Sequence, residues 1–373
     1  MMFNLKNRYP IGIDITDQNI YAAQFQETRQ GISIRGLFYR KLNNGQTHGT
    51  EPDDALVPVL KEIAKNKRFR GKSVSIHLPA RHIYSFPITF EIGGDETIED
   101  GMVRESRRHL SFPLEEAVID YPSIIDISSE GEKKFKAIMI AVNKDNIEQY
   151  IHLLKRAGLW VQAIDFDLSS LLRLHNYLYS IKDDPLILCN IGYHQSLIAI
   201  VTQNGILAQR HTPWGIQHLL NRLETNLELS GNSEQALAML KKYGLYYEHH
   251  ISADSDVSVE ENRDKDDAME IYRTVFQILN PYVDGLIHEF YQITGYVRSE
   301  MQSVKFEEIF MYGHASSINF LDQYLEKKLN IPTKCINPMG KLTLLDSSLL
   351  ADTAEAAPFA LALGLAMRKV TWL

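Results

Sequence analysis

Two short turns carry the residues best suited to chemistry in this sequence. Asp14 ends the apolar run 11–13, and Asn190 ends the apolar run 186–189. Thr16 and Gly192 stand two positions further on, where each chain segment turns. Backbone N–H groups that converge in such turns form concavities that bind anions, including phosphate. The two turns therefore predict a site that holds nucleotide phosphates between them.

Other motifs for catalysis or for binding phosphate or metal are incomplete or absent in this sequence. The stretch 70–73, Arg-Gly-Lys-Ser, resembles the end of a Walker A loop, but Asn66 replaces the earlier glycine and a strand is expected to follow. His288-Glu289 lacks the second histidine of a zinc protease, and no Cys or His cluster has metal-ligand spacing. No Gly-x-Ser-x-Gly motif is present. We therefore expect no catalytic residue and no metal site, and classify the chain as not an enzyme.

The two turns belong to a repeated unit of three strands. The first copy is expected at 11–16, 20–25 and 31–37, and the second at 186–189, 196–201 and 206–210. Gly31 and Gly205 open the third strand of each copy, and Asn204-Gly205 is a strong hairpin signal. Two copies of one unit predict two related halves that face a cleft.

The region between the two copies alternates strands with amphipathic helices. We expect strands at 74–78, 83–86, 117–125 and 135–142, a helix over 96–109 with Met102 and Val103 inward, and a helix over 146–157 with Ile151 and Leu154 inward. After the second copy we expect a helix over 233–242 with Ser233 as N-cap, a surface loop over 247–267, a long helix over 269–300, and a closing helix over 356–367.

Composition limits the class of protein. The 373 residues carry a net charge of −8, which argues against broad binding to nucleic acids or anionic membranes. The hydrophobic share of 45% is typical of a folded globular protein, and the length indicates two or more domains. Two cysteines, no long apolar run and no signal peptide favour a cytoplasmic location.

Five stretches, taken in order, resemble the actin-like ATPase superfamily. Within it the sequence is most similar to the PilM-type type IV pilus assembly proteins, which are relatives of the FtsA division proteins. The stretches that carry the resemblance are the strand and turn at 11–15, the segment 107–121 with its Phe-Pro turn and Asp-Tyr pair, the helix pair at 219–245, the turn at 311–316 with the following 321–338, and the small-residue helix at 357–366.

The resemblance implies an α/β protein with the actin-like ATPase fold, in which two related lobes surround a cleft and a small α+β domain is inserted. The first lobe would comprise 1–73, 159–185 and 355–373. The inserted, SHS2-like and partner-binding domain would comprise 74–158, and the second lobe 186–354.

The resemblance also implies a nucleotide site for ATP with Mg²⁺, at Asp14, Thr16, Asn190, Gly192, Glu289 and Gly313. Several positions depart from the family's pattern. Asn190 replaces an expected Asp, Asp17 stands where small residues should approach phosphate, and the glycine-rich adenosine turn keeps only Gly313. An amide cannot act as a carboxylate toward a magnesium-bound water. We therefore expect nucleotide binding to be weak or lost.

For partners, the resemblance implies a scaffold that docks the cytoplasmic segment of a PilN-like inner-membrane protein and couples it to the pilus assembly motor. The expected contact residues are Tyr84, Phe86, Phe112, Asp120 and Tyr121, which could hold an extended peptide by edge-strand addition. The protein would lie in the cytoplasm at the inner face of the inner membrane. We expect no nucleic-acid partner and leave homo-oligomerisation open.

Two alternatives remain at this point. An active ATPase or phosphotransferase on the same fold would use Asp14 and Asn190 with magnesium. The second alternative is a GspL-like component of type II secretion, although such proteins continue into a membrane helix that we do not expect here. We do not favour an FtsA-like role, since it would require an amphipathic membrane helix that the sequence does not show.

Overall fold

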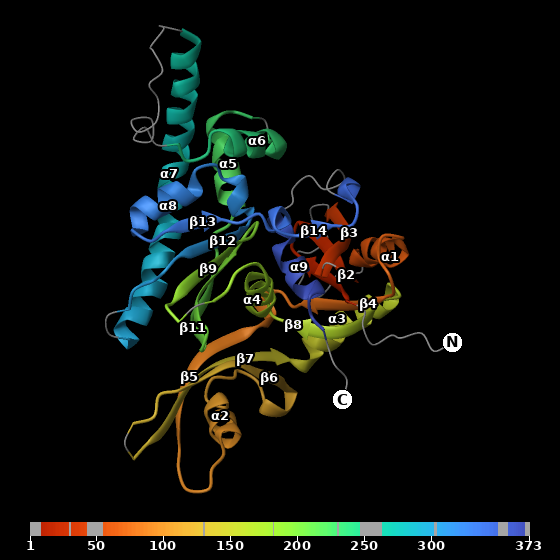
Figure 1. The fold of residues 1–373 in the computed structure, drawn as a ribbon, viewed down its shortest axis with the longest axis vertical. Helices are drawn as coiled ribbons and strands as arrows, with labels where there is room; N and C mark the ends of the chain where they lie inside the picture. The colour runs from red at the N-terminus through yellow and green to blue at the C-terminus, as the bar shows by residue number, and fades with distance from the viewer. Residues whose placement is uncertain are drawn as a thin grey trace. The chain divides into compact units, whose positions relative to one another are not determined.

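The computed structural model describes residues 9–29, 31–42, 55–129, 131–181, 183–229, 231–246, 263–301, 304–349 and 357–369. The chain forms two compact units. The first comprises 1–183, 201–208 and 338–373, and the second comprises 184–200 and 209–337. The two sheet systems that carry the candidate site residues are shown in Figure 1.

A six-stranded sheet forms the centre of the first unit, in the order β14-β3-β2-β1-β4-β8. β1 pairs antiparallel with β2 and parallel with β4, so the sheet combines a meander with crossover connections. The strands are β1 Ile11–Ile15, β2 Asn19–Thr28, β3 Gly31–Lys41, β4 Ser73–His77, β8 Trp160–Asp165 and β14 Thr343–Leu344.

Helices cover both faces of this sheet. The isoleucines at 11, 13 and 15 of β1 pack with residues of α1 (Leu56–Lys65) and α3 (Lys144–Arg156) in one core cluster. Gly12 faces the other way, toward α9 (Ala360–Ala366), and a Cβ at Gly12 would lie 2.1 Å from the carbonyl oxygen of Ala362. The small residues of α9 therefore let its backbone lie directly on β1, while α4 (Asp167–Leu178) packs beside α9.

The inserted domain is a three-stranded antiparallel sheet in the order β5-β7-β6, with one helix on one face. Its strands are β5 Tyr84–Ile92, β6 Ala117–Asp126 and β7 Lys133–Asn143, and its helix is α2 Ile98–Ser106. Thr97 and Asp100 form a reciprocal capping box at the start of α2, a device that satisfies two helix N–H groups. Phe90, Met102 and Met139 lie in the core between sheet and helix. The small inserted α+β domain expected from sequence is therefore present.

The second unit is built on a five-stranded sheet in the order β11-β10-β9-β12-β13. The tip of its β10–β11 hairpin, residues 201–208, groups with the first unit. The strands are β9 Leu186–Ile191, β10 Ser196–Thr202, β11 Gly205–Thr212, β12 Ile309–Gly313 and β13 Thr333–Cys335. The helices are α5 Ile216–Asn226, α6 Ser233–Lys242, α7 Arg263–Glu300 and α8 Leu321–Leu329.

The repeat expected from sequence is visible in the strand orders. β3-β2-β1-β4 in the first unit corresponds to β11-β10-β9-β12 in the second. In each case a meander ends on a central strand that pairs parallel with a strand reached much later in the chain. The duplicated arrangement places Asp14 and Asn190 at matching positions. The boundaries of the two lobes and the inserted domain that the resemblance implies remain a prediction.

Several local expectations were wrong. Val103 on α2 and Ile151 on α3 are exposed, at 38% and 39%, while Tyr150 and Leu153 are buried in place of Ile151. Asn232, not Ser233, caps α6, because its side-chain oxygen accepts the backbone N–H of Gln235.

Two further boundaries differ from the expectation. α7 begins at Arg263, so the end of the expected 247–267 loop is helical, and residues 247–262 lie outside the described part of the chain. The closing helix is α9 at Ala360–Ala366, preceded by a 3₁₀ turn at Ala357–Phe359. Within the described residues, none of the helices combines the length and apolar character needed to cross a membrane.

Candidate functional site

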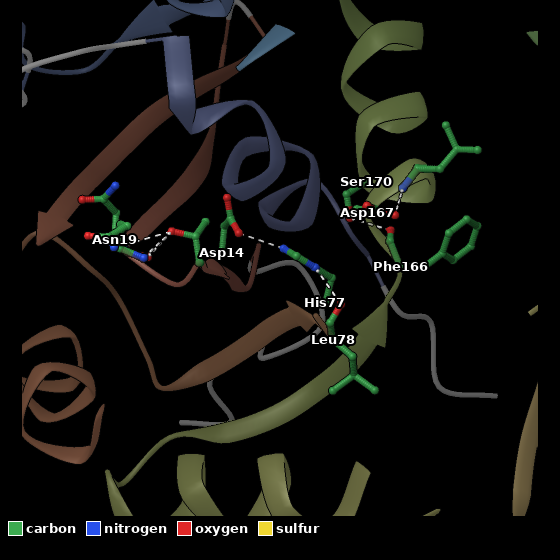
Figure 2. A network of polar contacts seen from close by, with 10 residues as sticks. Asp14, Asn19, His77, Leu78, Phe166, Asp167 and Ser170 are labelled. Carbon is green, nitrogen blue, oxygen red and sulfur yellow. Dashed lines mark hydrogen bonds and ion pairs between the residues drawn. The ribbon is translucent and has the colours of Figure 1, made fainter. Parts of the chain in front are cut away.

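Asp14 is buried and makes an ion pair with a histidine that the sequence did not single out. His77, the last residue of β4, places its Nε2 atom 2.8 Å from the Oδ1 atom of Asp14 (Figure 2). Both side chains are almost completely enclosed, with 3% exposure for Asp14 and 9% for His77. The second ring nitrogen of His77 lies 3.0 Å from the carbonyl oxygen of Leu78. The Asp14 carboxylate is thus engaged within the first unit.

The environment of His77 keeps its imidazole protonated. Burial alone lowers the pKa of His77, but the hydrogen bond and negative charge of Asp14, with the charge of Asp167 at the start of α4, raise it to about 9. Both ring nitrogens of the protonated form donate, one to Asp14 and one to Leu78. The pair is therefore a buried imidazolium–carboxylate contact at neutral pH.

The turn that follows Asp14 is closed by Thr16. The Thr16 hydroxyl donates to the carbonyl oxygen of Asn19 at 3.0 Å and accepts the backbone N–H of Asn19, also at 3.0 Å. The backbone N–H of Thr16 also donates to that carbonyl. Asp17, at the tip, makes an exposed ion pair with Arg81 at 3.3 Å. The polar groups of this turn point to each other, and its tip carries a carboxylate.

The matching turn in the second unit is equally closed on itself. The backbone N–H of Gly192 donates to the carbonyl oxygen of Gln195 at 3.1 Å, and a Cβ at Gly192 would lie 2.3 Å from that oxygen. The first backbone N–H groups of α5, at Ile216 and Gln217, donate to the carbonyls of Gly192 and Tyr193. These N–H groups therefore bond to the protein's own backbone.

The structure brings Asn190 and Gly313 together. The two residues end the parallel strands β9 and β12, and a Cβ at Gly313 would lie 2.8 Å from the side-chain oxygen of Asn190. Gly313 has φ +68°, a left-handed value that favours glycine. Tyr312, which pairs in register with Asn190, is fully buried. Tyr312 thus occupies in the second unit the place that His77 occupies in the first.

Glu289 lies on α7 and pairs with a residue of β11. Its carboxylate makes an ion pair with the guanidinium of Arg210 at 2.8 Å. The side chain is mostly enclosed, so the charge is compensated within the second unit.

The fit of these residues to a magnesium nucleotide is poor. Magnesium prefers carboxylate and water oxygens in an octahedral arrangement. Asp14 is held by a protonated histidine, Asn190 is neutral, and Glu289 is paired with arginine. The described turn N–H groups of Thr16, Asn19 and Gly192 bond within their own turns rather than toward a phosphate. Among the described residues, no group of three or more His, Cys, Asp or Glu is arranged to hold a metal ion.

The aromatic residues expected to contact a partner gather on one face of the inserted sheet. Tyr84 and Phe112 pack edge to face with ring centroids 5.3 Å apart, and Phe86 stacks on His109 at 5.4 Å. The Tyr121 hydroxyl lies 2.8 Å from the Ser106 hydroxyl of α2. Tyr84, Phe86 and Tyr121 all border the core cluster of the domain and are half-buried.

Asp120 lies on the opposite face of the same sheet. It is exposed, and its carboxylate accepts the backbone N–H of Tyr121 at 2.8 Å, where the β6–β7 register shifts. Val118, two positions earlier on β6, is 44% exposed. Its partner across the strand pair, Val142, belongs to the core cluster that includes β1 and α1. Val118 and Asp120 therefore lie on the face that approaches the six-stranded sheet.

The sequence model of the family described as type IV pilus assembly protein PilM matches residues 12–370, nearly the whole chain. The chain belongs to the PilM family of type IV pilus assembly proteins. One solved structure, titled as a PilM–PilN type IV pilus biogenesis complex, is similar with a TM-score of 0.73 and 18% sequence identity, covering 97% of this chain and 99% of that one.

A second solved structure shares the fold at greater distance. The ethanolamine utilization protein EutJ from Carboxydothermus hydrogenoformans gives a TM-score of 0.51 and 13% identity, covering 97% of this chain and 90% of that chain. The fold is the actin-like ATPase fold, in agreement with the expectation from sequence.

His77 is a residue of this site that sequence analysis missed. It ends β4, a strand with the pattern Ser-Val-Ser-Ile-His, just as Asp14 lies near the end of β1. In a parallel pair, the ends of neighbouring strands lie side by side. A polar residue at the end of the next parallel strand was therefore the signal that could have identified it.

Proposed function

We propose that this chain acts as a scaffold in type IV pilus assembly, which captures the cytoplasmic segment of a PilN-like inner-membrane protein through its inserted domain. Membership of the PilM family supports the pilus role. The similar structure whose title names a PilM–PilN complex supports a PilN-like partner. On this proposal the chain lies in the cytoplasm at the inner membrane and links its partner to the assembly motor.

The first half of β6 carries the proposed contact. Among the described residues, β6 pairs with β7 on one side and no strand is paired with its other edge. Such an edge presents backbone N–H and C=O groups to which an extended peptide can add. The second half is partly covered, since the Ser123 hydroxyl accepts the backbone N–H of Ile206 at the β10–β11 hairpin tip. This leaves Val118 and Asp120 as the exposed apolar and charged contacts.

The aromatic residues have a supporting role in this proposal. Tyr84, Phe86, Phe112 and Tyr121 fix α2 and its following loop on the sheet, through the ring contacts and the Tyr121–Ser106 hydrogen bond. They hold β6 in place rather than meet the peptide directly. Asp120 is the residue of the expected set whose carboxylate is available to a basic group of the partner.

We further infer that the chain does not hydrolyse ATP. The observation that carries this inference is the buried Asp14–His77 ion pair, because a carboxylate committed to an imidazolium is a poor ligand for magnesium or its bound water. The neutral Asn190 at the matching position supports the same conclusion.

The test of partner capture is a titration of the protein with a labelled peptide that covers the cytoplasmic segment of the PilN-like protein of the same organism. We expect Asp120→Ala to weaken binding about tenfold, which corresponds to roughly 1.4 kcal/mol. Glu99→Ala, which removes an exposed carboxylate from α2 in the same domain, is the matched control and should bind like the wild type. Equal peptide binding by Asp120→Ala and the wild type would show that the β6 edge is not the binding site. Absence of peptide binding by the wild type would contradict the proposal of a PilN-like partner.

A further inference from the structure

The second unit contains a cavity of about 350 Å³ between α7 and α8. Three aromatic side chains line it: Phe276 from α7, Tyr324 from α8, and Phe320 from the residue before α8. Asn280, one turn from Phe276, lines it too, and the hydroxyl of Tyr324 donates to the side-chain oxygen of Asn280. Aromatic walls with a few convergent polar groups are typical of ligand sites, and this volume lies at the small end of their range.

Phe320 is held in a backbone conformation that its side chain disfavours. It has φ +61° and ψ +13°, the left-handed region. The preceding residue, Asn319, is fixed to the end of α6 and to the segment after it. Its amide donates to the carbonyl of Lys242 at 3.0 Å, and its carbonyl accepts the N–H of Leu245 at 2.9 Å. Strained residues of this kind cluster at ligand-binding positions.

The contact between Asn319 and the segment after α6 requires a residue without a side chain at position 244. A Cβ at Gly244 would lie 2.2 Å from the carbonyl oxygen of Asn319, so the two backbones touch where Phe320 begins. The ring of Phe320 then packs against Tyr246 with centroids 5.4 Å apart, and Tyr246 packs against Tyr272 of α7 at 4.7 Å. The strained residue is thus one end of a continuous aromatic wall.

The rim of this cavity is positively charged. Lys327 and Lys328 line it from the last turn of α8, and the ammonium of Lys328 lies 5.4 Å from the centre of the Tyr324 ring. Burial raises the pKa of Tyr324, so its hydroxyl stays neutral and can bond to Asn280. Asp284, one turn beyond Asn280 on α7, is the acid whose charge reaches Tyr324. Lysines at the rim of an aromatic cavity favour an acidic group of a partner by charge complementarity.

We propose that this cavity binds a short acidic segment of another protein. One aromatic or large aliphatic side chain of that segment enters between Phe276 and Phe320, and a neighbouring carboxylate pairs with Lys327 and Lys328. A single buried anchor with charged neighbours is the usual energetic pattern of such contacts. This site lies in the second unit, so it does not depend on the β6 edge and stands or fails independently of it.

The test uses a phage-displayed library of random dodecapeptides, selected on the intact wild-type protein. The enriched sequences should share an aromatic or large aliphatic residue flanked by Asp or Glu. Synthetic peptides of these sequences should bind the Lys327→Glu/Lys328→Glu variant at least about tenfold more weakly than the wild type. The matched control is Lys61→Glu/Lys65→Glu, which reverses two exposed charges on α1, one of them also in a last helical turn, and should bind like the wild type.

A second variant separates binding from folding. Phe320→Asn removes the ring and introduces a residue that tolerates the left-handed backbone conformation. We expect it to lose peptide binding while its melting temperature stays equal to or above that of the wild type. A lower melting temperature with unchanged peptide affinity would show that the ring is only structural and would overturn the proposal.

Other results of the selection and of the binding measurements would contradict the proposal. Failure to enrich any sequence, enrichment without the acidic pattern, or equal binding to the Lys327→Glu/Lys328→Glu variant would each overturn the proposal. Light scattering that finds a wild-type dimer and a monomeric double variant would assign this surface to a second copy of the chain, and would overturn it as well.

Discussion

The two copies of the strand meander differ in charge at the same place. In the first unit the residue near the end of the central strand is Asp14, and its neighbour on the parallel strand is the protonated His77. In the second unit the corresponding residues are Asn190 and Tyr312, which are both uncharged at neutral pH. The first copy keeps a carboxylate but compensates it, whereas the second has an amide in its place.

One fold thus accommodates the same position in two ways, with a buried ion pair or with two neutral side chains. A buried ion pair satisfies its charges internally, but it makes each partner depend on the other. A neutral pair carries no such dependence. We therefore expect substitutions in the first copy to affect stability strongly, and substitutions in the second copy to be mild unless they alter backbone geometry.

The largest expected effect comes from His77→Ala. The substitution leaves the Asp14 carboxylate buried without its cationic partner, and breaking a buried pair in this way costs about 3–5 kcal/mol. Chemical denaturation followed by circular dichroism would measure the loss in free energy of unfolding. A loss below about 1 kcal/mol would mean that the carboxylate is solvated or protonated, as for an exposed pair.

The pH dependence of stability should report the same pair. The pKa of His77 is about 9 in the folded protein and 6.5 in the reference state, so its protonation stabilises the folded state. This contribution, about 3 kcal/mol, is fully present below pH 6.5 and is lost as the pH rises through 9. Unfolding curves between pH 6 and 10 should show the decline. An Asp14→Asn/His77→Gln variant is the control, and an equal decline in it would assign the effect to other groups.

In the second copy, Gly313→Ala should have an intermediate effect. Gly313 has φ +68°, and an added Cβ would lie 2.3 Å from the carbonyl oxygen of Ile191. We expect a loss of roughly 1–3 kcal/mol, measured by denaturation. Gly340→Ala is the matched control because no atom lies within 4 Å of its added Cβ. Equal stability of the two variants would show that the turn at Gly313 relaxes freely.

The smallest effect is expected for Asn190→Ala. Asn190 is half-buried and neutral, and its loss should cost no more than about 1 kcal/mol, the usual net worth of a hydrogen bond. Asn190 corresponds to Asp14, so this cost can be set beside that of breaking the Asp14–His77 pair in His77→Ala. A cost as large as that of His77→Ala would show that charge is not what distinguishes the two copies.

Local sequence signals were enough to predict the repeat. The strands of both meanders were predicted from the apolar runs that end at Asp14 and Asn190 and from the turn at Gly205. This worked because strands and tight turns depend mainly on residues that are neighbours in sequence. The contact of Asp14 with His77 could not be predicted in this way. It joins residues 63 positions apart through the parallel pairing of β1 and β4, which periodicity does not encode.

The errors on helix faces and caps have a related cause. On α3 the apolar residues form one broad face with Ile151 at its edge, and tertiary packing leaves that edge exposed while it buries Tyr150 and Leu153. At α6 the successive residues Asn232 and Ser233 are both good caps, and the backbone N–H of Gln235 selects Asn232. In both places, tertiary packing or one hydrogen bond decided between two locally acceptable choices.

We propose that the residues expected to hold nucleotide are committed to internal contacts, so that the chain neither binds nor hydrolyses ATP. Isothermal titration calorimetry of the wild type with millimolar ATP and Mg²⁺, run beside an assay for released phosphate, tests it most directly. We expect no heat of binding and no phosphate release. Micromolar binding that disappears in Asp14→Asn, or phosphate release above the no-protein control, would contradict it.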